Sequence, residues 1–169
     1  MLSRFLAAAL LFATPAVADT LTGHPVVTDG DTFRFKGGLK IRLFGVDTPE
    51  KNQKCEWKSA CYPCGRDAAD FVRALVGKNE MTCALTGDKT YDRFVAVCSV
   101  GKKDVGEAII AAGWGLPYRQ FLKGHPLEAS YVAAEKGAQA QKRGLNRGRF
   151  ISPADWRARK MRLECERGE

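Results

Sequence analysis

Two short segments decide the fold of this chain: VTDGDTFRF at residues 27–35 and KIRLFGVDTPE at residues 40–50. Polar and apolar residues alternate in each, as in a β-strand with one buried face. Between them lies Gly37-Gly38, a dipeptide typical of a hairpin turn. We therefore expect two neighbouring strands, each with an acidic corner at one end. The first corner is DGDT at residues 29–32, and the second is DTPE at residues 47–50.

Further strands are indicated on both sides of this pair, at residues 20–29, 80–85 and 94–98. The segment 87–90 is turn-like, and a hairpin centred there places Cys83 opposite Cys98.

Helical segments interleave with the strands. They are indicated by apolar spacing and by end signals such as the Asp104–Glu107 capping box and the Ser152-Pro153 start. The expected ranges are 68–75, 108–112, 126–142 and 153–161. About five short strands with a few packed helices favour an α+β fold. We predict a five-stranded OB-type Greek-key β-barrel with three to four packed helices.

Residues 1–18 have the layout of a secretory signal peptide: a short basic start, an apolar run and Ala16-Val17-Ala18 before Asp19. We expect cleavage there, a periplasmic or secreted protein, and a single domain over residues 19–169 with no membrane anchor after cleavage. No later segment is apolar enough to span a membrane.

The chain has a formal net charge of +8. A basic surplus favours polyanionic partners such as nucleic acid, anionic lipid or acidic glycans, although alone it is weak evidence.

The six cysteines, an even number in an exported chain, indicate disulfides. The sequence does not choose among the possible pairings. Our hypothesis is Cys83–Cys98, which has a geometric basis, with Cys55–Cys64 and Cys61–Cys165, which have none. Two other interpretations of Cys61-x-x-Cys64 are half a zinc site, for which no second half exists, and a thioredoxin-like redox pair, for which no buried strand precedes it.

The acidic corners carry the chemistry. Asp31 and Asp47 can meet at one end of the sheet, and two carboxylates with a main-chain carbonyl make an oxygen-rich site that suits Ca²⁺. Each corner alone is more often an ordinary turn. Both together, with Arg42 between them, favour a metal site.

Hydrolysis of a phosphodiester needs charge stabilisation and a base that activates water. Arg42 and Arg93 are candidates to hold the phosphate, because a guanidinium matches two phosphate oxygens, and Glu50 is a candidate base. Strict alternation places Arg42 and Asp47 on opposite faces of a strand, so this site requires the strand to end or bend near Gly45.

The sequence resembles the staphylococcal nuclease-like enzymes, whose signature blocks match residues 27–32, 41–50 and 91–97 and GWGLPY at 113–118. The resemblance covers residues 20–156. It implies an OB-type barrel and hydrolysis of DNA and RNA to 3′-phosphate ends. It also implies a Ca²⁺ site at Asp31, Asp47 and the Thr48 carbonyl, Glu50 as general base, and Arg42 and Arg93 on the phosphate. Three features depart from the family pattern: Asp92 where glycine is usual, Gly144-Leu145-Asn146 where many bacterial relatives have Gly-Leu-Trp, and the cysteine-bearing insert 52–64.

Tyr91 and Tyr118 are candidates to stack on bases or touch phosphate, although half-buried packing is an equal alternative. The basic tract from Lys142 to Arg162 could follow a nucleic-acid backbone, but a solvated helix face is the safer interpretation.

We expect DNA or RNA as substrate and a monomer with no obligate protein partner. The main alternative is a non-catalytic OB-type module that binds nucleic acid or another polyanion, and a glycan-binding protein with a structural Ca²⁺ site is a further one.

Overall fold

The structure is a computed structural model that describes residues 19–159, 161, 163 and 165. The signal peptide expected at residues 1–18 lies outside the described residues. Within the described part of the chain, no helix has the length and apolar character needed to cross a lipid bilayer.

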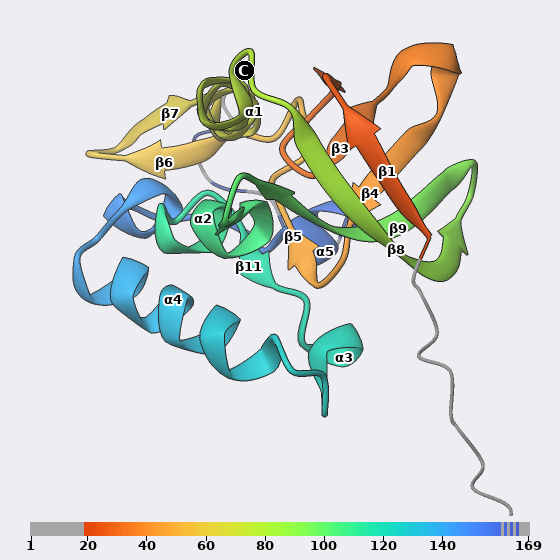
Figure 1. The fold of residues 1–169 in the computed structure, drawn as a ribbon. Coiled ribbons are helices and arrows are strands. Elements are labelled where there is room, and N and C mark those ends of the chain that lie inside the picture. The colour runs from red at the N-terminus through yellow and green to blue at the C-terminus, as the bar shows by residue number, and fades with distance from the viewer. Residues whose placement is uncertain (1–18, 160, 162, 164, 166–169) are drawn as a thin grey trace, which may run out of the picture.

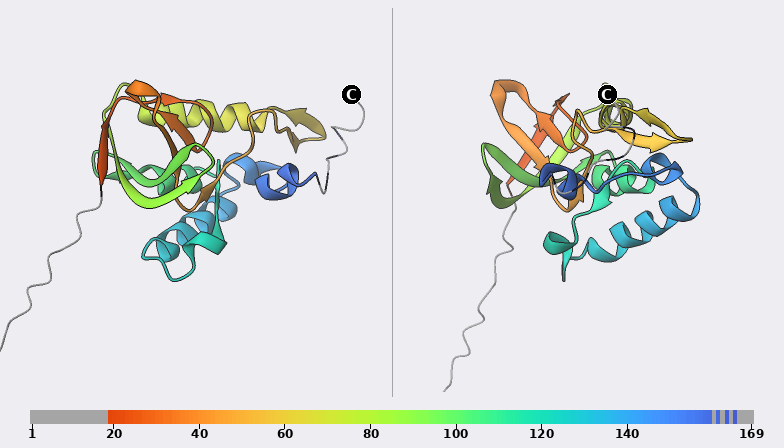
Figure 2. Two further views of the ribbon diagram at one scale, coloured as in Figure 1. Left: turned by 90° about the vertical axis from the view of Figure 1, so that its right-hand side faces the viewer. Right: turned by 180° about the vertical axis from the view of Figure 1, so that it is seen from behind.

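The main sheet is curled into a barrel, seen at the right of Figure 1 and from two further sides in Figure 2. Its strand order is β1-β8-β9-β4-β3-β2, with β10 beside β9. The bounds are β1 Thr20–Gly23, β2 Val26–Val27, β3 Thr32–Arg34, β4 Lys40–Leu43, β8 Met81–Thr90, β9 Arg93–Val100 and β10 Lys103–Asp104.

Strands β1 and β2 stand at opposite ends of this order, yet only His24 and Pro25 separate them in the chain. Together they form one bent strand that brings the two edges of the sheet together. Proline suits this bend because it cannot donate a ladder hydrogen bond. With β1 and β2 as one unit, the main barrel strands number five, which confirms the predicted OB-type barrel.

The long hairpin β8–β9 turns at Tyr91-Asp92 rather than at residues 87–90, so the predicted position of that turn is wrong. Strand β8 continues to Thr90 through a register shift between Leu85 and Lys89. The polar segment in that shift is a bulge, which has the same local composition as a turn. Cys83 still pairs with Cys98 in the register.

The described residues form five α-helices, two of them a single turn long. The bounds are α1 Cys64–Val76, α2 Val105–Ala111, α3 Arg119–Leu122, α4 Glu128–Ala140 and α5 Pro153–Arg157. The predicted caps are present: the Asp104 side chain accepts from the Glu107 amide at 2.7 Å, and Ser152 caps α5. Helix α5 ends earlier than the predicted residue 161.

One core joins the barrel to its helices, since α2 contacts β9 on one side and α4 on the other. The apolar side chains that fill it are Phe33, Ile41, Met81 and Ala96 from the sheet, and Val72, Val76, Ile109 and Ile110 from α1 and α2. The core fixes the positions of β3 and β4, at whose ends the polar cluster of residues 29–50 lies.

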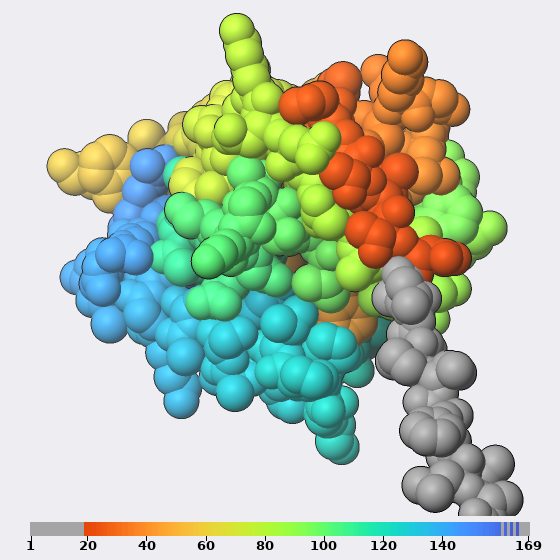
Figure 3. All heavy atoms as spheres, in the orientation of Figure 1, coloured from red at the N-terminus to blue at the C-terminus, as the bar shows by residue number. Residues whose placement is uncertain are grey.

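The cysteine-bearing insert forms a separate hairpin, β6 Cys55–Trp57 with β7 Ala60–Tyr62. In Figure 3 this yellow hairpin projects from the body beside the blue C-terminal part of the chain. Glu56 and Arg149 exchange two backbone hydrogen bonds of 2.8 Å there. The insert is therefore docked on the segment that leads into α5.

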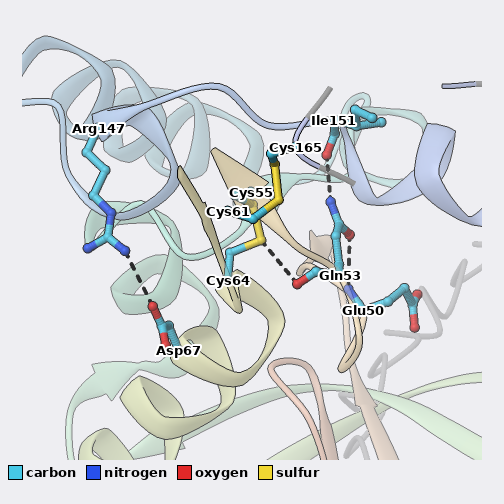
Figure 4. Close-up of a disulfide and its surroundings, with 9 residues drawn as sticks. All are labelled: Glu50, Gln53, Cys55, Cys61, Cys64, Asp67, Arg147, Ile151 and Cys165. Atoms are coloured by element: carbon cyan, nitrogen blue, oxygen red, sulfur yellow. Dashed lines mark hydrogen bonds and ion pairs between the residues drawn. A yellow bond between two sulfur atoms is a disulfide. The ribbon is translucent and has the colours of Figure 1, made fainter. Parts of the chain in front are cut away.

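Three disulfides are present: Cys55–Cys64, Cys61–Cys165 and Cys83–Cys98. These are the pairings hypothesised from the sequence, and no cysteine is free. Cys61 and Cys64 belong to different bridges (Figure 4), so the redox and zinc interpretations of that pair are wrong. A chain with three disulfides fits an oxidising compartment.

The first turn of α1 approaches the loop at Glu50 so closely that only glycine fits at position 65. A Cβ there would lie 1.8 Å from the Glu50 carbonyl oxygen. We predict that Gly65→Ala lowers the free energy of unfolding by about 1–3 kcal/mol, the usual range for overpacking. Urea denaturation measures this difference.

Gly137→Ala is the matched control, because Gly137 lies in a helix of the same length and a Cβ there meets nothing within 4 Å. It should stabilise the protein by about 0.5–1 kcal/mol through helix propensity. Equal effects of the two variants would contradict the close approach at Glu50.

Candidate active site

The two acidic corners meet on the side chain of Arg42. Thr32 and Arg42 are partners in the β3–β4 register, and the Leu43 amide donates to the Asp31 carbonyl at 2.9 Å. Arg42 Nη1 donates to Asp31 Oδ1 at 2.8 Å, and its Nη2 donates to Asp47 Oδ1 at 3.2 Å. One guanidinium therefore bridges both carboxylates.

The bend that this site requires occurs at Gly45. Strand β4 ends at Leu43, Gly45 has φ 69°, and β5 (Val46–Asp47) then leaves the main sheet. It pairs instead with β11 (Leu116–Pro117). The odd separation of Arg42 and Asp47 thus ceases to matter, because they lie on different strands with a left-handed glycine between them.

A second glycine lets the corners touch. A Cβ at Gly30 would lie 2.6 Å from Thr48 Oγ1, so only a residue without a side chain allows this approach. The Thr48 amide donates to Asp31 Oδ2 at 3.3 Å. The main chain of the second corner is therefore bonded directly to the carboxylate of the first.

The carboxylates at these corners are buried: Asp31 and Asp47 each have an exposed fraction of 4%. Burial raises the pKa of Asp31 to about 6, against the opposing effect of Arg42, and the nearby charges of Asp29 and Asp47 add to the rise. Burial therefore disfavours the ionised form of Asp31, and an added positive charge nearby would stabilise that ionised form.

Glu50 lies at the rim of the cluster, with its side chain 39% exposed. Its Oε1 accepts a 2.9 Å hydrogen bond from Arg157 of α5, and the same guanidinium binds both oxygens of Asp47. From the sequence, Arg157 is one arginine of the basic C-terminal tract and was not predicted as a site residue. Nothing local in the sequence distinguishes it from the other arginines of that tract.

An open cleft of about 680 Å³ adjoins these residues. The residues that line it include Asp31, Arg42, Thr48, Glu50, Tyr91, Arg93, Tyr118, Phe121 and Arg157. The predicted catalytic, metal-binding and substrate-binding residues, apart from Asp47, thus line one cleft, and Asp47 is bonded to two of its lining residues, Arg42 and Arg157.

At the far side of the cleft, Arg93 Nη1 donates to Thr32 Oγ1 at 3.0 Å, which holds it near the first corner. Tyr91 is 94% exposed, and Tyr118 stacks edge-on against Phe121 with ring centroids 4.7 Å apart. Asp92 forms an ion pair with Lys40, whose hydrogen bond lowers the Asp92 pKa. Its carboxylate is therefore held by a neighbour other than Arg93.

A cleft lined by carboxylates and arginines can hold a hard cation and a phosphate group side by side. A family model described as "Staphylococcal nuclease homologue" matches residues 40–147. The chain belongs to this family.

Several curated proteins are similar to the chain, and two of the three described below are named as endonucleases. The succinoglycan biosynthesis protein ExoI of Rhizobium meliloti is 32% identical over 136 residues, which cover 79% of this chain and 71% of that protein. An uncharacterized endonuclease of Haemophilus influenzae is 28% identical over 136 residues, 78% of this chain and 69% of that protein. A probable endonuclease, LCL3, of Phaeosphaeria nodorum is 33% identical over 113 residues, 63% of this chain and 37% of that protein.

The raised pKa of Asp31 predicts a pH-dependent stability of the metal-free protein. In the unfolded chain this group ionises near 3.8 and in the folded protein near 6, so between these values the folded state binds the additional proton. Its contribution to stability therefore falls as pH rises through that window and is constant above it. Asp31→Asn removes this contribution.

We expect the stability of Asp31→Asn relative to the wild type to rise from pH 4 to about pH 6.5 and then level off. Urea denaturation in the presence of a chelator measures both proteins across this range. A relative stability that is flat, or that falls with pH, would show that Asp31 does not titrate as its burial implies.

Proposed function

We propose that this protein is a calcium-dependent, sequence-nonspecific endonuclease that hydrolyses phosphodiester bonds of DNA, RNA or both to 3′-phosphate ends. The observation that carries the proposal is the bridge of Arg42 between two buried carboxylates, with Glu50 and Arg93 lining the same cleft. Family membership and the endonuclease names of two relatives support it.

The residues fit a hard divalent cation. Asp31 and Asp47 present buried carboxylate oxygens on one guanidinium, and the Thr48 main chain is bonded to Asp31. The described residues contain no group of three or more His, Cys, Asp or Glu side chains arranged for a metal. A site with two carboxylates and a carbonyl leaves positions for water and substrate phosphate, which Ca²⁺ accepts readily. When bound, Ca²⁺ would supply positive charge at the phosphate.

Three side chains would supply the general base and the transition-state contacts. Glu50 is partly exposed at the cleft, where it accepts a proton from the attacking water. Arg42 and Arg93 stabilise the additional negative charge of the five-coordinate phosphorus. The bond from phosphorus to the 5′ oxygen breaks, that oxygen takes up a proton, and the phosphate stays on the 3′ side. Arg42 must exchange at least one carboxylate contact to reach the phosphate.

The surroundings of the site suit a nucleic-acid strand. Tyr91 and Tyr118 offer aromatic faces beside the arginines, and stacking on a base contributes about 1–3 kcal/mol. The net charge of +8 favours association with a polyanion. We further propose that the protein acts as a monomer. We also propose that it is exported to the periplasm or the medium, and the three disulfides support this export.

A second candidate is a non-catalytic module that binds nucleic acid or another polyanion. The observation in its favour is that a relative is named for succinoglycan biosynthesis rather than for nuclease activity. The presence of Glu50 and both arginines at the cleft favours the enzyme.

Digestion assays decide between the two candidates. We expect the purified mature protein to degrade DNA or RNA with Ca²⁺, to lose activity with a chelator, and to lose much of it when Mg²⁺ replaces Ca²⁺, since the smaller ion demands stricter geometry. Binding of nucleic acid without cleavage under every metal condition would favour the binding module.

Glu50→Gln tests the base directly. Removing a general base typically slows turnover by about 10²–10⁴-fold, while binding of nucleic acid, measured by fluorescence anisotropy, should be largely retained. Glu80→Gln is the control, because Glu80 is an exposed carboxylate just before β8 and does not line the cleft. Unchanged turnover in Glu50→Gln would remove Glu50 from the mechanism.

A further inference from the structure

Arg157 lies within the carboxylate cluster although it comes from the C-terminal helix α5. We infer that Arg157 is a positioning residue that holds Asp47 and Glu50, competes with a divalent cation for Asp47, and moves toward substrate phosphate when that cation binds. This inference rests on the proposed function and deepens it.

The contacts of Arg157 differ from those of a surface ion pair. Its Nη1 and Nη2 donate to Asp47 Oδ1 and Oδ2 at 2.9 and 3.0 Å, so both oxygens of a buried carboxylate are bound by one fork. Nη1 also donates to Glu50 Oε1 at 2.9 Å. Two-pronged pairing of this kind is both stronger and more directional than a single contact.

The fork occupies the oxygens that a cation would need. Asp47 Oδ1 already accepts from Arg42 at 3.2 Å, so three N–H groups satisfy this carboxylate. A metal ligand must offer a lone pair, and a cation at Asp47 would also repel the guanidinium. Three of the roughly four lone-pair positions of this carboxylate are taken, so Arg157 and a cation compete for Asp47.

The C-terminal segment is anchored so that Arg157 returns to this position. The Ser152 side chain caps α5, and Pro153 and Ile151 are buried. Cys165, eight residues after Arg157 in the sequence, is joined to Cys61 of the insert hairpin (Figure 4).

Gln53 connects this segment to the candidate base. Its amide is fully buried and lies between Glu50 and Ile151 in Figure 4. The Glu50 amide donates to Gln53 Oε1 at 3.2 Å, and Gln53 Nε2 donates to the Ile151 carbonyl at 2.8 Å. One side chain thus sets the spacing between the Glu50 loop and the start of the segment that carries Arg157.

The carboxylates at the site outnumber the arginines by one. Arg42, Arg93 and Arg157 lie near the carboxylates of Asp29, Asp31, Asp47 and Glu50, so a divalent cation would leave an excess of positive charge that a substrate phosphate then offsets. A guanidinium displaced from Asp47 remains at the cleft that it lines, where a phosphate oxygen is its best new partner. Arg157 therefore weakens cation binding to the free protein and strengthens it when nucleic acid is present.

Calorimetric titration with Ca²⁺ alone tests the competition. Arg157→Ala and Arg157→Gln should bind Ca²⁺ roughly fivefold more tightly than the wild type, the scale of one partly exposed ion pair. Arg157→Lys keeps the charge but not the two-pronged pairing. Its Ca²⁺ affinity should lie between that of these two variants and that of the wild type. The control is Arg73→Ala, which removes an arginine paired with Asp70 on the surface of α1. It should bind Ca²⁺ as the wild type does.

Repeating the titration with a phosphorothioate oligonucleotide that resists cleavage tests the release. The oligonucleotide should tighten Ca²⁺ binding more in the wild type than in Arg157→Gln. A purely structural role of Arg157 would leave Ca²⁺ affinity unchanged or weaker in the variants, and either result, or equal tightening by the oligonucleotide, overturns the inference. If the wild type binds no Ca²⁺, the proposed calcium dependence fails. If it binds Ca²⁺ but the Arg157 variants bind it no more tightly, only the inference about Arg157 fails.

Discussion

The structure depends on the bridge that Arg42 makes between Asp31 and Asp47. Two buried carboxylates repel each other and resist ionisation, and the raised pKa of Asp31 shows that the arginine offsets this cost only in part. The bridge joins the end of β5 to the turn before β3, together with the hydrogen bond from the Thr48 amide to Asp31. In the function proposed above, a divalent cation would supply the positive charge that Arg42 alone does not.

Backbone close approach makes this bridge possible. Gly45 takes the left-handed turn that separates Arg42 from Asp47, and Gly30 leaves room for Thr48 to lie against the first corner. Gly65 gives the Glu50 carbonyl the space that a Cβ would take. The buried amide of Gln53 then connects the Glu50 loop to the C-terminal segment. The carboxylates are therefore held by the fold before any ligand arrives, and preorganised charge of this kind is what catalysis by electrostatic stabilisation requires.

Local patterns predicted the barrel strands, the caps at Asp104 and Ser152, and the need for a bend at Gly45, because each of these is set by residues close in sequence. The turn of the β8–β9 hairpin was misplaced, since a polar bulge and a polar turn look alike without the partner strand. The position of Arg157 was not predicted. It depends on contacts between segments far apart in the sequence, such as the hydrogen bond from Gln53 to Ile151, which leave no local signal. The Cys61–Cys165 bridge was hypothesised, but without a geometric basis that could place Arg157.

A structure of the protein crystallised with Ca²⁺ tests the central claim most directly. The account predicts one ion per chain, in contact with carboxylate oxygens of both Asp31 and Asp47 and with the Thr48 carbonyl oxygen. An ion bound elsewhere, or a saturating Ca²⁺ concentration that leaves both carboxylates on Arg42 with no ion between them, would contradict it.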